Sequence, residues 1–321
     1  MKAIKEINTP FIKGRSCLFS ALRVIALLFH RNYPEGYIHS FSGGWEVFYG
    51  GDKKSGIPLV FPQIEYCVSE FSKNCGLSYH VYQGEFVREC TRELLLGESK
   101  VFLAIINLSI LPSRDRALDT IIKDEIHFII IFGLDNDRRV KIYDPYLVNR
   151  KGEIETMFCR IPLDKLCNGI IECYCIEEAQ DILKKDAIEN VHDKISRFFH
   201  KQKVNNMYFG YAACLALSED LRDGCFNGKQ LVQMAFMIKT SLFYTLDYLP
   251  DILANGETDT YNMVDEKIRN QKKDWNSMYF RLLRRGYADK VLLNDEKKEL
   301  ADQLYETLLH YKDLFSFLVQ S

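Results

Sequence analysis

The sequence predicts an α+β protein in which a central helix packs on an antiparallel sheet and an all-helical domain follows. Three observations lead to this prediction. A long apolar helix begins near Cys17, strand-like segments follow up to about residue 178, and helical periodicity dominates the rest. We therefore expect a mixed domain over residues 1–178 and a helical domain over residues 179–321. A chain of 321 residues is long enough for two such domains.

The predicted elements follow from periodicity and from turn residues. The first helix starts at Ser16–Cys17 and is apolar on most faces, as expected of a helix buried on nearly all sides, and Asn32, Pro34 and Gly36 end it. The later segments of the first domain are predicted in order: a strand between the glycine pairs of 43–51, an amphipathic helix over 63–75, a strand over 77–83, a helix over 84–96, a buried strand over 100–111, a hairpin over 125–146, a short helix over 161–167 and a closing strand over 170–177. Five or so helices then form a bundle, over 185–202, 207–223, 228–253, 261–286 and 294–320.

The hairpin over residues 125–146 is the clearest unit. Two β-rich runs flank the turn-like composition at 135–137. If the turn centres on residues 136–137, facing residues have numbers that sum to about 273, and Asp144 lies opposite Ile129. Because residues two apart share a strand face, Asp144 becomes the diagonal neighbour of His127. A bulge would shift this register by one residue.

Three residues form a candidate nucleophilic set. Cys17 stands at a predicted helix N-terminus, where free N–H groups and the helix dipole favour a thiolate, although a buried structural cysteine is the common alternative. His127 interrupts an apolar strand, where a lone histidine is usually a hydrogen-bonded core residue. Asp144 could hold that ring in one tautomer and stabilise the imidazolium. We expect Cys17 to act as nucleophile, His127 as base and Asp144 as the residue that orients the base.

These residues carry a resemblance to known proteins. The order Gly14–Arg15–Ser16–Cys17, then His127–Phe128, then Tyr143–Asp144–Pro145 resembles papain-like folds of the bacteriocin-processing peptidase type. The wider pattern is similar to the butirosin biosynthesis protein H family, through the segment SFSGGWEVFY at 40–49 and the segment FGYAACLALSEDL at 209–221.

The resemblance implies a papain-like catalytic domain and an acyltransferase of antibiotic-type small-molecule biosynthesis. Such an enzyme takes an acyl or aminoacyl group from an acyl carrier protein, or its phosphopantetheinyl thioester, and passes it to a small-molecule amine. The acyl group rests on the cysteine in between. We expect no cofactor and no bound metal.

The sequence departs from the processing peptidases at the oxyanion hole. They place a glutamine six residues before the cysteine, and Phe11 stands there in this chain. The backbone N–H of Cys17 is the natural first donor to an oxyanion. Asn8, Lys13, Ser16 or Ser42 could supply a second, and the sequence does not choose between them.

Composition limits the partners. The net charge is -2 and no basic block occurs, so we expect no nucleic-acid partner. No apolar stretch is long enough to span a bilayer, and the N-terminus lacks a secretory pattern, so we expect a protein without a membrane partner. Ten cysteines in such a chain indicate reduced thiols and a cytoplasmic location. Cys173 and Cys175 are interpreted as one face of a strand, not as metal ligands.

Two other function classes stay open. A papain-like peptidase or thioester hydrolase would use the same three residues, because water and amines attack the same acyl-enzyme. A non-enzymatic scaffold that binds a partner through its helical half is the third class. The arginines at 281, 284 and 285 could contact an acidic carrier protein or a phosphate, although such a cluster is more often a solvated helix face.

Overall fold

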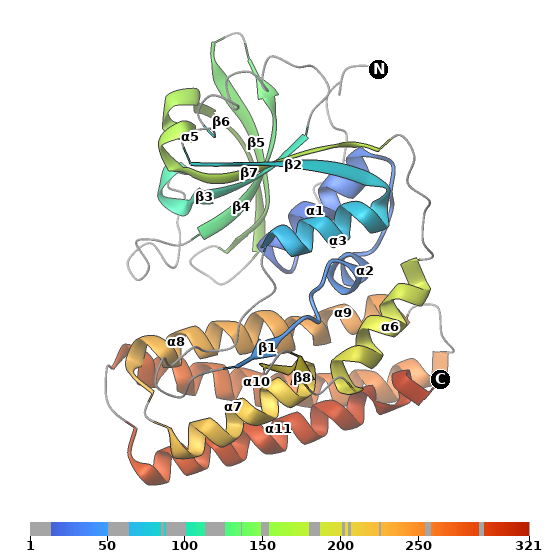
Figure 1. The fold of residues 1–321 in the computed structure, drawn as a ribbon, viewed down its shortest axis with the longest axis vertical. Helices are drawn as coiled ribbons and strands as arrows, with labels where there is room; N and C mark the ends of the chain where they lie inside the picture. Colours follow the sequence, from blue (N-terminus) through green and yellow to red (C-terminus); the bar gives the residue numbers. More distant parts are fainter. Residues whose placement is uncertain are drawn as a thin grey trace. The chain divides into compact units, whose positions relative to one another are not determined.

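The computed structural model describes most of the chain. The described residues are 14–50, 64–84, 87, 101–112, 126–135, 137–148, 154–179, 187–200, 203–204, 207–224, 226–253, 258–288 and 292–320. The protein is a mixed helix and sheet protein with a six-stranded antiparallel sheet and a helical C-terminal region (Figure 1).

Residue contacts divide the chain into two compact units. Of the described residues, those within Met1–Ile38 and Val68–Lys184 form the first unit, and those within His39–Cys67 and Lys185–Ser321 form the second. The sequence-based division near residue 178 assigned segment 39–67 to the first domain, whereas this segment groups with the helices. The reason is pairing over a long sequence distance, because strand β1 (Phe48–Tyr49) pairs with β9 (Met207–Phe209).

The sheet of the first unit has the strand order β2-β7-β3-β4-β5-β6. Its strands are β2 (Leu77–Gln83), β3 (Val101–Asn107), β4 (Ile126–Leu134), β5 (Arg139–Val148), β6 (Ile154–Pro162) and β7 (Ile170–Glu178). The last strand, β7, lies inside the sheet between β2 and β3 (Figure 1). Six of the seven residues of β3 are buried, as the unbroken apolar run of this segment predicts.

Helices cover both sides of this sheet. Helix α1 (Cys17–Leu28) packs against β3, β4 and β5, and the short α5 (Leu163–Gly169) packs against β3, β5 and β6 on the other side (Figure 1). A buried apolar cluster joins β3 to β7 with Leu166 of α5, and it includes Cys173 and Cys175. These two cysteines therefore belong to the core, in agreement with their interpretation as a strand face.

The helices of the second unit surround an aromatic core. They are α6 (Ala187–His200), α7 (Gly210–Asp223), α8 (Gly228–Met237), a π-helical turn η2 (Ile238–Phe243), α9 (Tyr244–Leu253), α10 (Thr258–Tyr287) and α11 (Asn294–Gln320). Trp45 is buried edge-on against Phe198 of α6 and Phe315 of α11. This packing anchors the turn around Trp45 to helices that lie more than a hundred residues away in sequence.

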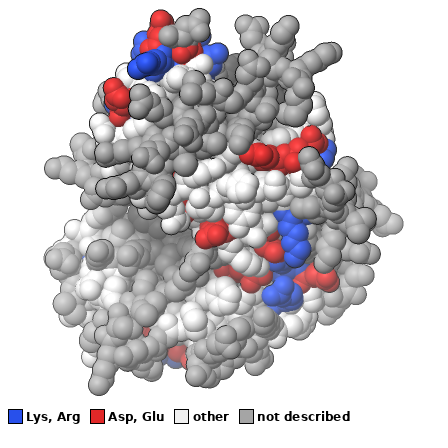
Figure 2. Space-filling model, turned by 45° about the horizontal axis from the view of Figure 1, so that its top comes forward, with Lys and Arg blue, Asp and Glu red and all other residues white. Residues whose placement is uncertain are grey.

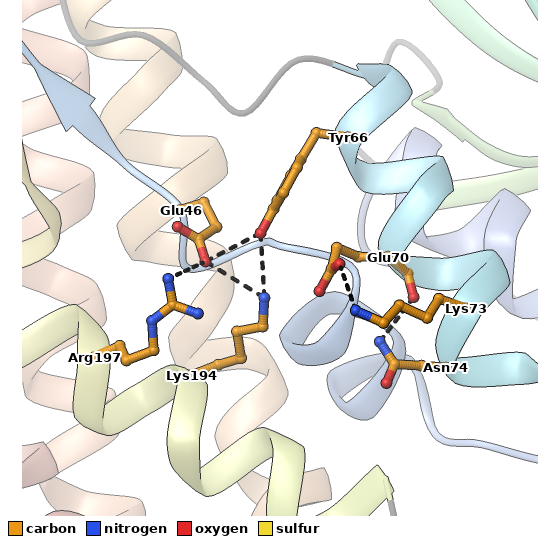
Figure 3. A network of polar contacts seen from close by, with 7 residues as sticks. All are labelled: Glu46, Tyr66, Glu70, Lys73, Asn74, Lys194 and Arg197. Atoms are coloured by element: carbon orange, nitrogen blue, oxygen red, sulfur yellow. Dashed lines mark hydrogen bonds and ion pairs between the residues drawn. The ribbon is translucent and has the colours of Figure 1, made fainter. Parts of the chain in front are cut away.

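A buried ion pair fastens the same turn to helix α6 (Figure 3). Nζ of Lys194 lies 3.4 Å from Oε1 of Glu46, and both residues are 5 % exposed or less. Tyr66 donates its hydroxyl hydrogen to the same carboxylate oxygen at 3.3 Å. Arg197, whose side chain is half-exposed, approaches it to 3.8 Å. A buried charge needs such partners, since desolvation disfavours it otherwise.

Several predicted elements agree with the structure and others differ. Helix α1 begins at Cys17, within the predicted start, and Ser16 is its N-cap. Helix α3 (Ile64–Cys75) ends one residue before Gly76, whose positive φ of 66° suits glycine. The sequence did not predict α2 (Glu35–Phe41), because Pro34 and Gly36 resemble a turn. It also missed edge strand β6, whose mixed polar residues mask its period, and the short strand β8 (Lys203–Val204). The helix predicted over 84–96 lies almost wholly outside the described residues.

Charged groups of both signs are intermixed on the described surface. On the face shown in Figure 2, lysines and arginines lie in small groups together with aspartates and glutamates. Arg160, for example, lies 3.7 Å from Asp135 across the β4–β5 hairpin end. Among the helices of the described chain, none has both the length and the apolarity that crossing a membrane requires.

Candidate active site

Cys17 is the first residue of helix α1 and stays partly exposed. The residue before it, Ser16, has extended backbone and accepts a hydrogen bond from the N–H of Phe19 at 3.3 Å. No acidic side chain stands in the first turn of α1. The thiol therefore lies at the positive end of an apolar helix and can be reached from outside, which are the two conditions for a reactive cysteine.

His127 and Asp144 meet across the β4–β5 hairpin. Nε2 of His127 lies 2.7 Å from Oδ2 of Asp144, and both side chains are buried. The pairs Ile130–Tyr143 and Ile131–Ile142 each sum to 273, so the predicted register holds beside the site. Nearer the turn the sum is 274, and a bulge between Ile131 and Gly133 corrects the register. The expected contact between His127 and Asp144 is thus present.

Both oxygens of the Asp144 carboxylate have partners. Oδ2 faces His127, and Oδ1 accepts the backbone N–H of Tyr146 at 2.9 Å. This second bond is the Asx-turn that an aspartate forms with the backbone two residues on. Because Asp144 is 0 % exposed, these bonds replace the water that its charge loses. They also fix the carboxylate so that it can orient the ring.

Cys17 completes the arrangement by contacting the His127 ring. Burial alone would lower the pKa of His127, but the charge and hydrogen bond of Asp144, together with a hydrogen bond and charge from Cys17, raise it to about 10. Since Nε2 is engaged with Asp144, the other ring nitrogen remains for the sulfur. The ring is therefore held as an imidazolium between a carboxylate and the sulfur at neutral pH.

This pKa predicts how stability depends on pH. A folded pKa of about 10, above the ordinary histidine value of 6.5, means that the His127 contacts stabilise the fold fully below about pH 6.5. This contribution is lost as pH rises through about 10. We expect the free energy of unfolding of the wild type to fall more between about pH 6 and about pH 10 than that of a His127→Gln variant. Equal losses in the two proteins would contradict this expectation.

The buried thiol of Cys175 offers a reporter for the measurement. It lies fully buried in the core of the first unit, so it is labelled only when that unit unfolds. Labelling of Cys175 in urea, at each pH and in each variant, gives the unfolding equilibrium of the unit that contains His127.

Of the four candidates for the second oxyanion donor, Ser16 and Ser42 lie among the described residues, and they belong to different units. Ser16 lies directly beside Cys17, and its oxygen accepts from Phe19, which leaves its hydroxyl hydrogen as a donor. Ser42 is buried in the second unit. Asn8 and Lys13 lie outside the described residues, as does Phe11. Ser16 and the N–H of Cys17 are thus the donors of the first unit that the described geometry retains.

Other side chains weighed from the sequence have structural explanations. Arg281 pairs with Glu299 at 3.0 Å, and Arg285 pairs with Glu296. Two of the three arginines near 281–285 therefore have carboxylate partners on α11, as expected of a solvated helix face. His39 lies fully inside the second unit, where burial lowers its pKa to about 3 and keeps it neutral.

One contact beside Cys17 escapes sequence reasoning. The carboxylate of Glu35 accepts the backbone N–H of Arg15, two residues before Cys17. Glu35 follows Pro34 in a segment that resembles a turn, and nothing in its local pattern indicates a partner 20 residues earlier.

Comparison with known proteins adds no family assignment to this geometry. No protein-family model matches the chain, and no curated protein matches it significantly.

Proposed function

We propose that this protein is a papain-like cysteine acyltransferase, which moves an acyl or aminoacyl group from a carrier-protein thioester to a small-molecule amine. The observation that carries the proposal is the contact sequence Cys17–His127–Asp144, with the thiol at the first position of an apolar helix and the imidazole held by a buried carboxylate. The chain order of the three residues and the helix-then-sheet order of the unit also support a papain-like fold.

The proposed reaction has two halves. The Cys17 thiolate attacks the thioester carbonyl, and the tetrahedral oxyanion accepts a hydrogen bond from the N–H of Cys17. The oxyanion then collapses, the carbon–sulfur bond of the donor breaks, and His127 gives its proton to the departing thiolate. An amine next attacks the acyl-cysteine and loses a proton to neutral His127. Collapse of the second intermediate releases the amide and restores the thiolate–imidazolium pair.

Two considerations favour transfer over hydrolysis. The resemblance to the butirosin biosynthesis protein H family implies a thioester donor and an amine acceptor. The second unit is large and helical, whereas the three catalytic candidates all belong to the first unit. A hydrolase needs no second unit to deliver water, and an acceptor held next to an acyl-enzyme gains up to about 7 to 11 kcal/mol from proximity. The same three residues would nevertheless serve a peptidase or thioester hydrolase.

The test supplies an acyl thioester of N-acetylcysteamine with and without amines, aminoglycosides included. We expect an acyl mass increment on the Cys17 peptide, no such increment in a Cys17→Ala variant, and an amide product whose yield depends on the amine. Cys159 and Cys167 are also partly exposed and serve as internal reference thiols in the same digest.

Two outcomes would change the conclusion. Free acid that forms at one rate, whatever amine is present, would identify a hydrolase. If Cys17 is acylated no faster than Cys159 or Cys167, Cys17 is not the nucleophile. The hypothesis of a non-enzymatic scaffold would then remain.

A further inference from the structure

Glu35 has a buried carboxylate that contacts the loop immediately before Cys17. It is 2 % exposed and begins helix α2. Its Oε1 accepts the backbone N–H of Arg15 at 3.0 Å and the hydroxyl hydrogen of Ser20 at 2.7 Å, and its Oε2 lies 3.2 Å from the same Arg15 nitrogen. Both partners are donors, so the site suits a group that only accepts hydrogen bonds.

Ser20 extends this contact to the residue next to the nucleophile. Its oxygen, one turn into α1, accepts the backbone N–H of Ser16 at 3.3 Å. Glu35 therefore holds Arg15 directly and Ser16 through Ser20. A hydroxyl that donates to a carboxylate is also a better acceptor, since hydrogen bonds in a chain polarise one another.

Gly14 ties the other end of the loop to the strand that carries Asp144. Its N–H donates to the carbonyl oxygen of Pro145 at 3.1 Å. A Cβ at Gly14 would lie 1.6 Å from Oγ of Ser20, so the loop packs against this serine too closely for any side chain. All three residues before Cys17 thus have a hydrogen-bond partner, on β5, on Glu35 and on Ser20.

We propose that Glu35 is a positioning residue, which holds loop 14–16 so that the sulfur and the backbone N–H of Cys17 stay aligned with His127. This inference rests on the proposed function, because it concerns the geometry of the same acylation step. Misplacing a reacting group by about 1 Å can lower a rate by about 100-fold. The loss of one of the hydrogen bonds that hold loop 14–16 is therefore sufficient to impair catalysis. In this role Glu35 acts through Arg15 and Ser20, whose N–H and hydroxyl it accepts.

Two variants test the proposal against acylation by the N-acetylcysteamine thioester. Glu35→Gln keeps the size of the side chain but turns one oxygen into a donor that faces the Arg15 N–H. Ser20→Ala removes the link to Ser16 and leaves the carboxylate with Arg15. We expect each to lower the plateau rate of single-turnover acylation at high pH by about 10- to 100-fold. The double variant should lose little more than either single variant, because the two side chains act through one loop.

The matched control is Glu70→Gln, a glutamate of the same unit that pairs with the exposed Lys73 on α3 (Figure 3). It should acylate at the wild-type rate. The plateau rate also distinguishes an effect on geometry from an effect of charge. Loss of an anion near the α1 N-terminus would shift only the midpoint of the pH dependence of acylation and would leave the plateau rate unchanged. A merely structural role would leave the plateau of the folded protein unchanged.

The outcomes distinguish this inference from the proposed function. If wild-type Cys17 fails to accept an acyl group, the proposed function fails, and iodoacetamide labelling of Cys17 then tests the loop alone. If the wild type acylates and both variants share its plateau, Glu35 has no positioning role. If Glu35→Gln is unfolded at the assay temperature, Ser20→Ala decides, since it leaves no buried charge without a partner.

Discussion

Replacement of His127 by alanine is expected to lower the rate of Cys17 acylation by about 10²- to 10⁴-fold, the usual contribution of a positioned acid–base group. Among the described side chains, the His127 ring contacts both the Asp144 carboxylate and Cys17. In the proposed reaction this ring also supplies the proton for the leaving thiolate. Single-turnover acylation by the thioester, followed by mass spectrometry of the Cys17 peptide, measures the rate directly.

Asp144→Asn is the informative comparison, and we expect a smaller loss. The asparagine oxygen can still accept the N–H of Tyr146 and keep the Asx-turn, and His127 keeps its contact with Cys17. What the variant loses is the charge that raises the pKa of His127, so less imidazolium is present at neutral pH. A complete loss in Asp144→Asn with intact folding would indicate another role for Asp144, such as substrate binding.

Replacement of Glu46 by glutamine is expected to destabilise the second unit by about 3–5 kcal/mol. The change leaves the ammonium of Lys194 without its buried counter-charge, and Lys194 is 5 % exposed (Figure 3). The double variant Glu46→Gln/Lys194→Met should recover most of the lost stability, because it removes both charges from the interior.

Tryptophan fluorescence is well suited to this measurement. The chain has two tryptophans, Trp45 and Trp275, and both are buried in the second unit. Urea unfolding followed by their emission therefore reports on that unit. Arg222→Gln is the control, since the Arg222–Asp302 pair lies at the surface and should contribute at most about 1 kcal/mol. If the free energy of unfolding of Glu46→Gln lies within about 1 kcal/mol of the wild-type value, the ion pair between Glu46 and Lys194 is not essential to the stability of this unit.

Local pattern was sufficient for the elements around the candidate site. The start of α1 near Cys17 follows from the apolar run that begins there, and the hairpin of β4 and β5 follows from two β-rich runs around a turn. These features depend on residues that are close in the chain, so a single sequence is sufficient to predict them. The contact between His127 and Asp144 follows as well, since strand pairing across a short turn has few possible registers.

The sequence left undetermined what depends on contacts over long sequence distances. Strand β7 enters the middle of the sheet, and residues 39–67 group with helices more than a hundred residues later. Nothing local in 39–67 identifies the partners of Trp45 and Glu46, because aromatic packing and a buried ion pair are chosen by shape and desolvation in the folded state.

At the site, the sequence by itself determined the chemistry that is available: a thiol at a helix start, an imidazole in a strand and a carboxylate on the next strand. Only the tertiary structure decided that Cys17 contacts the His127 ring, that the Asp144 carboxylate is fully buried, and that the Glu35 carboxylate accepts the backbone N–H of Arg15. The physical reason is that the local sequence pattern determines which helices and strands form and which side chains they carry. Burial and hydrogen-bond partners depend on segments that are distant in sequence and that pack together and exclude water from these side chains.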